Sequence, residues 1–153
     1  MKILGLDMAT KTGWCLYDAP SGQVIESGVQ VFDKRRGESN GLRFLRFRKW
    51  LKSFVDGFHP DIICYEQAHF RGGAATELCV GFQTRAQEVA AEVGIESAPL
   101  PTGTLKKFAT GNGAANKSEM IKAAFLILGR EPQDDNEADA VHVARWGAHE
   151  FYE

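Results

Sequence analysis

Cysteine is scarce in this sequence, and what little there is forms no recognisable site. The three cysteines, Cys15, Cys64 and Cys79, are odd in number and contain no Cys-x-x-Cys pair, which excludes a disulfide framework and a zinc ribbon. Long apolar runs are also missing, because no 18 consecutive residues are apolar. We therefore expect no membrane span and no signal peptide, and a location in the reducing cytoplasm.

An excess of one charge is missing as well. Lys and Arg number 18 against 20 Asp and Glu, which gives a net charge of −2 and excludes a histone-like polycation. A chain of 153 residues can bury a core without disulfides or a structural metal. Since internal repeats and long linkers are absent too, the sequence predicts a single domain over residues 1–153.

Two kinds of apolar periodicity alternate along the chain. Strands are predicted at residues 2–7, 12–18, 23–32, 61–66 and 95–100. Helices are predicted at residues 40–58, 74–93, 117–128 and 134–148, the first with Ser39 or Asn40 as its N-cap. Residues 101–116 are rich in Gly, Thr, Lys and Asn and are expected to form a loop that leads into the helix after it.

The order of these elements predicts an α/β fold. The first three strands follow one another through short turns, so we expect them to be antiparallel. The later strands are separated by helices, which implies parallel right-handed connections. The sequence therefore predicts a five-stranded mixed sheet, three antiparallel strands followed by parallel strands, flanked by helices.

Three acids interrupt apolar elements. Asp7 and Glu66 each end a predicted buried strand, and Asp139 lies among alanines and valines of the last helix. A buried carboxylate is costly without a compensating cation, and two of them at one sheet edge need one even more. Oxygen ligands without a Cys or His cluster favour magnesium or manganese over zinc. Two such ions about 4 Å apart can activate water for phosphodiester hydrolysis.

A structural interpretation of the same acids stays open, because strand-terminal acids are often helix caps or members of salt bridges. Asp135 and Asn136 precede Asp139 by four and three residues, so either would share its helix face and complete a metal site. Their alternative role is to cap the helix.

Four segments together resemble the RuvC-type Holliday junction resolvases, a branch of the RNase H-like nucleases, in a compact phage or bacterial version. The segments are ILGLDMATKTGW, ICYEQAHF, LKKFATGNGAANKSEMI and NEADAVHVA. The resemblance implies an RNase H-like fold and a homodimer that binds four-way DNA junctions and makes paired nicks with a divalent metal. It also implies that Asp7, Glu66 and Asp139 hold the metal ions. A fourth acid is usual three residues before the last one, where this sequence has Asn136. Either its carbonyl oxygen or the neighbouring Asp135 would then complete the site.

Basic residues gather in two places. Eight positive charges fall between Lys34 and Lys52, and we assign Arg43 and Arg46 to the DNA phosphates, the alternative being a solvated helix face. Lys106 and Lys117 lie on either side of a glycine-containing loop. The resemblance places basic residues at these two positions against the junction backbone. Lys117 would also stabilise charge that develops in the transition state.

The loop after Glu66 contains His69, Phe70 and Arg71. In the resolvase family an aromatic residue near this position inserts at the junction centre, so Phe70 or His69 is a candidate for stacking on bases, the alternative being ordinary loop packing. Arg71 is assigned to the same DNA contact. A single histidine on a helix, such as His142, more often has a structural role than a catalytic one, so we leave it outside the predicted site.

Three other functions compete with a junction nuclease. An RNase H-like nuclease acting on RNA would keep the fold and change the substrate. A junction-binding module that has lost catalysis through Asn136 would bind DNA without cutting. An actin-like ATPase is the weakest alternative, because the chain is too short for two duplicated halves, and we expect no nucleotide cofactor.

Overall fold

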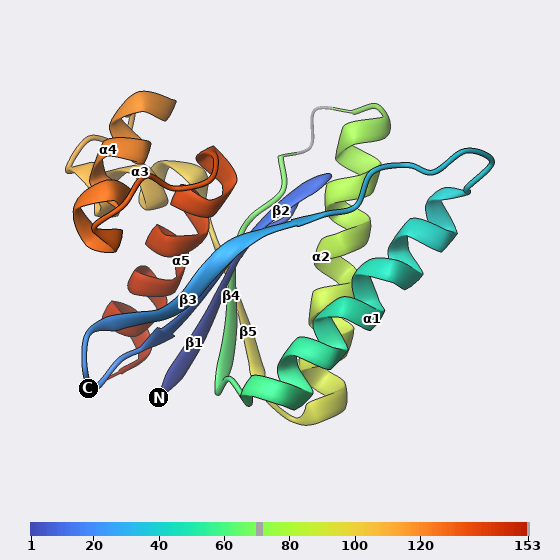
Figure 1. Ribbon diagram of the computed structural model, residues 1–153, viewed down its shortest axis with the longest axis horizontal. Helices are drawn as coiled ribbons and strands as arrows, with labels where there is room; N and C mark the ends of the chain where they lie inside the picture. The colour runs from blue at the N-terminus through green and yellow to red at the C-terminus, as the bar shows by residue number, and fades with distance from the viewer. Residues whose placement is uncertain (70–71, 153) are drawn as a thin grey trace.

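The computed structural model describes residues 1–69 and 72–152 and contains one five-stranded mixed sheet (Figure 1). Its strands are β1 (Lys2–Asp7), β2 (Lys11–Asp18), β3 (Gln23–Val31), β4 (Ile62–Glu66) and β5 (Glu96–Leu100). They lie in the order β3-β2-β1-β4-β5. The first three strands are antiparallel neighbours, and β1, β4 and β5 are parallel. The predicted sheet is confirmed.

The helices flank both faces of the sheet. They are α1 (Asn40–Phe58), α2 (Ala74–Val93), α3 (Thr102–Thr110), α4 (Lys117–Leu128) and α5 (Asp135–Phe151). Figure 1 shows α1 and α2 on one side of the sheet and α3, α4 and α5 on the other. Within the described residues, no helix combines the length and the apolar character needed to cross a membrane.

Helix α3 corrects the sequence analysis, which expected a loop over residues 101–116. Thr and Gly have low helix propensity and hid the helix. Burial of Leu105 stabilises the helix despite this low propensity, because Leu105 is only 1% exposed and packs in the same core as residues of α5. The helix ends at Thr110 and is followed by the C-cap Gly111, whose φ of 83° lies in the left-handed region that favours glycine.

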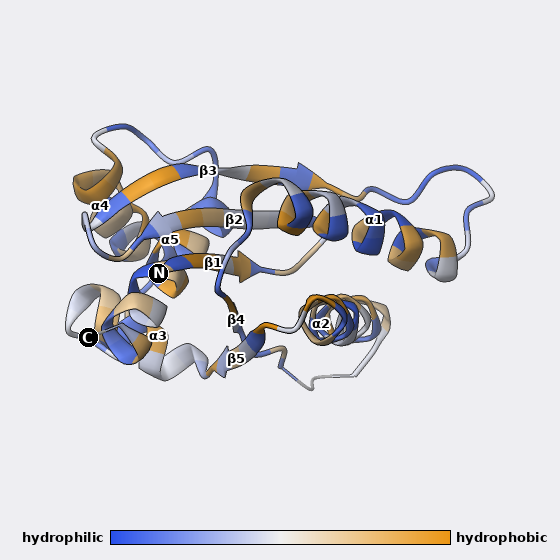
Figure 2. Cartoon of the chain, turned by 90° about the horizontal axis from the view of Figure 1, so that it is seen from below, coloured by the Kyte–Doolittle hydropathy of each residue, from blue (hydrophilic) through white to orange (hydrophobic). Residues whose placement is uncertain are grey.

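One face of the sheet packs against α1 and α2 through large side chains. Leu4 and Leu6 of β1 lie on this face, in a core with the aromatic rings of both helices. The rings of Phe47 and Phe82 are stacked with centroids 4.3 Å apart. Figure 2 shows hydrophobic residues along the strands and a hydrophilic segment between β3 and α1.

The opposite face lies almost in contact with the backbone of α5. A Cβ atom on Gly5 would lie 2.5 Å from the Ala140 carbonyl oxygen, and one on Gly13 would overlap with the Asn136 carbonyl group. Glycine at these two positions therefore allows α5 to lie directly on β1 and β2. The residues of α5 that meet the sheet are small as well, and Ala140 and Ala144 are fully buried.

The start of α5 is fixed by a cap that the sequence analysis did not identify. The Asp134 side chain accepts a hydrogen bond of 2.9 Å from the Glu137 backbone N–H, which makes Asp134 the N-cap. The predicted alternatives, Asp135 and Asn136, are instead the first two residues of the helix. The cap thus leaves the Asp135 carboxylate available for other contacts.

Candidate metal and nucleic-acid site

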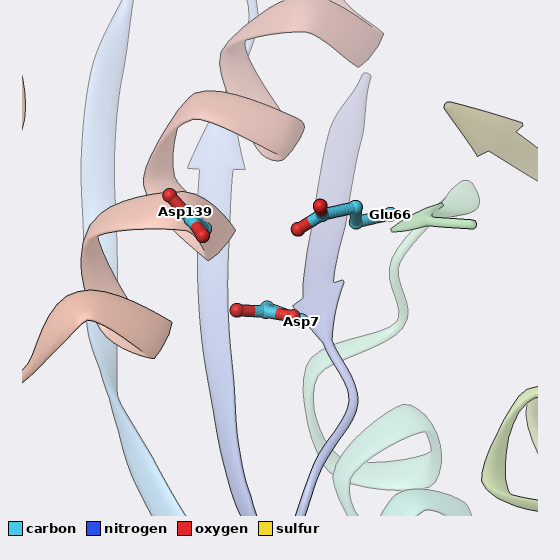
Figure 3. Close-up of side chains that lie close together, drawn as sticks. All are labelled: Asp7, Glu66 and Asp139. Atoms are coloured by element: carbon cyan, nitrogen blue, oxygen red, sulfur yellow. The ribbon is translucent and has the colours of Figure 1, made fainter. Parts of the chain in front are cut away.

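Strand alternation brings Asp7 and Glu66 together. Ile3 of β1 and Ile62 and Cys64 of β4 all face α5, so Asp7 and Glu66 lie on that same face by the period of two. The parallel pairing of Leu6 with Tyr65 makes these two acids the next neighbours across the sheet. Asp139 approaches them from α5, and the three carboxylates point toward one another (Figure 3). One oxygen from each lies within 4.8 Å of the others.

The electrostatics of this acidic site, Asp7, Glu66 and Asp139, are unfavourable without a cation. Burial raises the pKa of Asp7 well above its ordinary value, and the charges of Glu66 and Asp139 raise it further. Burial, followed by the charges of Glu66 and Asp135, raises the pKa of Asp139 to about 7, although Lys106 and Lys117 act in the opposite direction. The protein has gathered negative charge here that its own cations do not neutralise.

The donor set fits a hard divalent cation. Three carboxylates supply oxygen ligands at mutual distances that one ion can span, and they come from β1, β4 and α5. Such oxygen-only ligation suits magnesium or manganese. The raised pKa values are those that a bound cation would reverse, because it favours the ionised carboxylates.

Asp135 and Asn136 are the two candidates for the fourth ligand position. Asp135 lines a pocket of about 190 Å³ together with Glu66, Lys106, Lys117 and Asp139. The Asn136 amide instead donates to Asp134 over 3.5 Å. That contact uses the amide nitrogen and not the carbonyl oxygen, so the choice between Asp135 and Asn136 as the fourth ligand stays a prediction.

The two predicted lysines lie at the rim of this pocket. Lys117 is the first residue of α4, its side chain is 83% exposed, and its Nζ lies 3.5 Å from an Asp135 carboxylate oxygen. A capping box between Asn116 and Glu119 fixes the start of that helix. Lys106 on α3 lines the same pocket. Both ammonium groups therefore lie beside the acidic site and remain able to meet an anion.

Thr102 is a site residue that the sequence analysis missed. Its hydroxyl donates a hydrogen bond of 2.7 Å to the Glu66 Oε1 atom, and the His69 ring nitrogen Nε2 lies 2.6 Å from the same hydroxyl. The available signal was its place just after a strand that runs beside the Glu66 strand. On the other side of Glu66, a pocket of about 400 Å³ extends along the start of α2 and includes Asp7 and Cys79.

Arg43 is directed inward and Arg46 is held by an ion pair with Glu38, so both guanidinium groups have partners within the protein, and their assignment to DNA phosphates stays a prediction. Arg43 is 9% exposed, and its guanidinium donates to the Phe32 carbonyl and the Thr10 hydroxyl, each over 3.1 Å. Arg46 binds both carboxylate oxygens of Glu38, at 2.7 and 2.8 Å, and these hydrogen bonds lower the pKa of Glu38 to about 2. Both groups hold the segment between β3 and α1 in place.

The predicted stacking and DNA contacts of Phe70 and Arg71 lie outside the described residues and stay predictions. His142 is fully buried, and its Nε2 lies 2.9 Å from the Met120 carbonyl oxygen of α4. This contact joins α4 to α5, which is a structural role.

Comparisons with known proteins agree with this geometry. Residues 3–146 match the family model described as crossover junction endodeoxyribonuclease RuvC. The RuvC protein of Chloroflexus aurantiacus is 28% identical over 94% of this chain and 90% of its own. The structure of Thermus thermophilus RuvC in complex with a Holliday junction substrate is 21% identical, with a TM-score of 0.82, and the match covers 99% of this chain and 94% of that one.

A more distant similarity is to the yeast mitochondrial Holliday junction resolvase. That structure matches with a TM-score of 0.68 at 14% identity over 95% of this chain and 77% of its own. At such identities the two structures show the fold alone, and the family model shows the family. The chain belongs to the RuvC family of crossover junction endodeoxyribonucleases, which confirms the resemblance found in the sequence.

Proposed function

We propose that this chain is a divalent-metal-dependent endonuclease that nicks four-way and other branched DNA by phosphodiester hydrolysis and leaves 5′-phosphate ends. The observation that carries the proposal is the convergence of Asp7, Glu66 and Asp139, with one oxygen from each within 4.8 Å of the others. Membership of the RuvC family supports the choice of branched DNA.

The acidic site would hold magnesium or manganese, two ions in each active site, with Asp135 at its edge. Bound ions of this kind activate a water molecule and stabilise the leaving oxygen. The chain's own contribution is to fix three carboxylates on a rigid sheet and helix.

Lys106 and Lys117 would bind the DNA phosphates beside the acidic site. Both line the pocket that contains Glu66 and Asp139, and Lys117 is largely exposed. An ammonium group at this place would also stabilise negative charge that develops on the scissile phosphate. Phe70 and Arg71 remain candidates for contacts at the junction centre.

The active form would be a homodimer that acts in the cytoplasm, of a bacterium or of a host cell. Paired nicks on a four-way junction need two matched sites, which a two-fold dimer supplies. The described cysteines are free thiols, as a reducing compartment permits.

The Asp7→Asn variant tests this function, because it removes one charge from the acidic site and retains the shape of the side chain. We expect it to bind a synthetic four-way junction as the parent protein does and to make no nicks in magnesium. Gel shift and nicking assays on the same labelled junction measure both properties. Nicking at the parent rate by Asp7→Asn would refute the proposed site.

Two further measurements separate the competing functions. Matched RNA and DNA substrates, assayed in parallel with linear, three-way and four-way DNA, would reveal an RNA nuclease by preferential cutting of RNA. Titration calorimetry with manganese addresses the inactive module. Tight junction binding without any manganese binding would favour that module over the enzyme.

A further inference from the structure

A threonine outside the acidic cluster is hydrogen bonded to one of its three carboxylates. Thr102 follows β5 by two residues and begins α3. Because Glu66 pairs with Leu100 in the parallel register of β4 and β5, the chain after β5 passes beside the Glu66 side chain. The Thr102 hydroxyl there lies 2.7 Å from Glu66 Oε1 and 2.6 Å from His69 Nε2.

These two short contacts define a chain of hydrogen bonds with a single direction. A threonine hydroxyl has one proton to donate, and Glu66 as a carboxylate can only accept. The hydroxyl therefore donates to Glu66 and accepts from His69, whose Nε2 must carry a proton. The order of donors is thus His69, Thr102 and Glu66.

The Thr102 hydroxyl forms no hydrogen bond with its own helix within the described residues. Thr102 is the first residue of α3, after the N-cap Pro101. Its hydrogen bonds run instead to two residues more than 30 positions earlier in the chain, Glu66 and His69. Thr102 also lines the pocket that contains Asp135 and Asp139.

The outer end of this hydrogen-bond chain is anchored to α2. The backbone N–H of Ala68, next to His69, donates to the Gln83 side-chain oxygen over 3.0 Å. The Thr76 hydroxyl donates to the Gly72 carbonyl over 3.1 Å. The Ala68 contact holds the chain next to His69 against α2.

We propose that Thr102 is a positioning residue for Glu66, and that His69 supports it by a hydrogen bond to the Thr102 hydroxyl. Glu66 has one more rotatable bond than either aspartate of the cluster, and the hydrogen bond to Oε1 selects one orientation and directs the other oxygen toward Asp7 and Asp139. Ligands oriented in this way bind metal more tightly than free ones, and loss of such a partner costs roughly 10- to 100-fold in metal affinity or activity. The inference rests on the proposed function only in that Glu66 holds a metal ion.

The test compares Thr102→Val with Thr102→Ser. Valine keeps the shape and removes the hydroxyl, whereas serine keeps the hydroxyl and serves as the matched control. We expect Thr102→Val to bind manganese roughly 10- to 100-fold more weakly in titration calorimetry and Thr102→Ser to bind like the parent protein. The magnesium concentration for half-maximal nicking should rise in Thr102→Val and stay at the parent value in Thr102→Ser. Junction binding without metal should not change in either variant.

Three outcomes would overturn the inference. Parent-like manganese binding by Thr102→Val would show that the hydroxyl has no role. Equal losses in Thr102→Val and Thr102→Ser would show that packing, rather than the hydroxyl, matters. A His69→Ala variant that loses junction binding and retains its manganese affinity would remove His69 from the hydrogen-bond chain and place it against DNA. If the parent protein binds manganese and cuts no junction, the proposed function fails, while the calorimetric comparison still decides the role of Thr102.

Discussion

Glu137 and Asp139 lie two residues apart on α5, but the carboxyl group of Glu137 is surrounded by hydrogen-bond donors and that of Asp139 by other acids. Glu137 is 1% exposed and accepts hydrogen bonds of 2.6 Å from Arg130, Ser27 and the Gln133 backbone. Burial alone would raise its pKa, but the hydrogen bonds from Arg130 and Ser27 leave it below the ordinary value. Asp139 faces Glu66 and Asp135, and its pKa is raised to about 7.

The contrast separates a structural acid from a functional one. The protein satisfies Glu137 with its own groups, so that acid needs nothing from outside. It leaves Asp139 beside other negative charges, so the ionised form of that acid is destabilised until an external cation binds. Burial of an acid therefore says little about function until the partners of its oxygens are known.

The largest expected difference between the two acids is in catalysis. Asp139→Asn should lower the nicking rate by roughly 10²- to 10³-fold or more, as for the loss of an electrostatic group at the reacting atoms. Glu137→Gln should nick within a few-fold of the parent protein at a temperature where both variants are folded. Single-turnover nicking of a labelled junction measures both rates. Equal losses in the two variants would abolish the distinction.

Stability should reverse the order of the two acids. Glu137→Ala leaves the Gln133 N–H and the Ser27 hydroxyl without their acceptor and should lower the free energy of unfolding by about 2–4 kcal/mol. Asp139→Ala removes a repelled charge and should lower it by much less in the metal-free protein at pH 8. Urea unfolding of both variants, with EDTA present, provides the comparison. A greater loss in Asp139→Ala would contradict it.

The pH dependence of the metal-free protein should follow from the same pair. Asp139 has a pKa of about 7 when folded against an ordinary value of 3.8, so between these values the folded state retains a proton that the unfolded state has lost. Stability should therefore fall as the pH rises from about 4 to about 7, by roughly 2 kcal/mol or more. Glu137, with its lowered pKa, contributes stability that is lost only as the pH falls below about 4.

Thermal unfolding at pH 5 and pH 8 measures this slope. Asp139→Asn should flatten it, and magnesium should stabilise the parent protein at pH 8 far more than at pH 5, because the ion needs ionised carboxylates. A metal-free protein that is more stable at pH 8 than at pH 5 would show that repulsion among the carboxylates of the acidic site does not destabilise the folded state.

The smallest effect concerns the cations beside the two acids. Arg130 is committed to Glu137, whereas Lys117 is 83% exposed beside Asp135. Lys117→Gln should weaken junction binding and reduce the slope of log affinity against log salt by about 1. Arg130→Gln should leave that slope unchanged and lower the unfolding temperature. Fluorescence anisotropy over a series of salt concentrations measures these slopes. Equal slopes for Lys117→Gln and the parent protein would refute the assignment of Lys117 to a DNA phosphate.

Much of the acidic site follows from local patterns in the sequence. Asp7 and Glu66 end apolar strands with the same alternation, and parallel neighbours bring such ends to one edge. Which buried acid is neutralised could not be predicted, because the turn before α5 that brings Arg130 to Glu137 has no helical or strand periodicity, and the Ser27 hydroxyl that also binds Glu137 is 110 residues away in the chain. Arg43 shows the same limit, since its basic character suggested a surface role and its carbonyl and hydroxyl acceptors are set only by the tertiary fold.

The helix over Thr102–Thr110 was missed for a related reason. Its threonines and glycine suggest a loop, and the burial of Leu105 that stabilises the helix depends on α5, which comes later in the chain. The error also concealed Thr102, because a residue within a predicted loop gives no indication of which strand end it approaches.

Gly13 carries no functional group, yet it determines where Asp139 lies. The backbone of Asn136 occupies the space that a Cβ atom on residue 13 would need, and Asp139 is about one helical turn further along α5. An alanine at this position would push the first turn of α5 away from β2 and carry the Asp139 oxygens out of reach of the other two acids. A substitution can therefore abolish activity at a residue that has no ionisable side chain and does not contact the metal or the DNA.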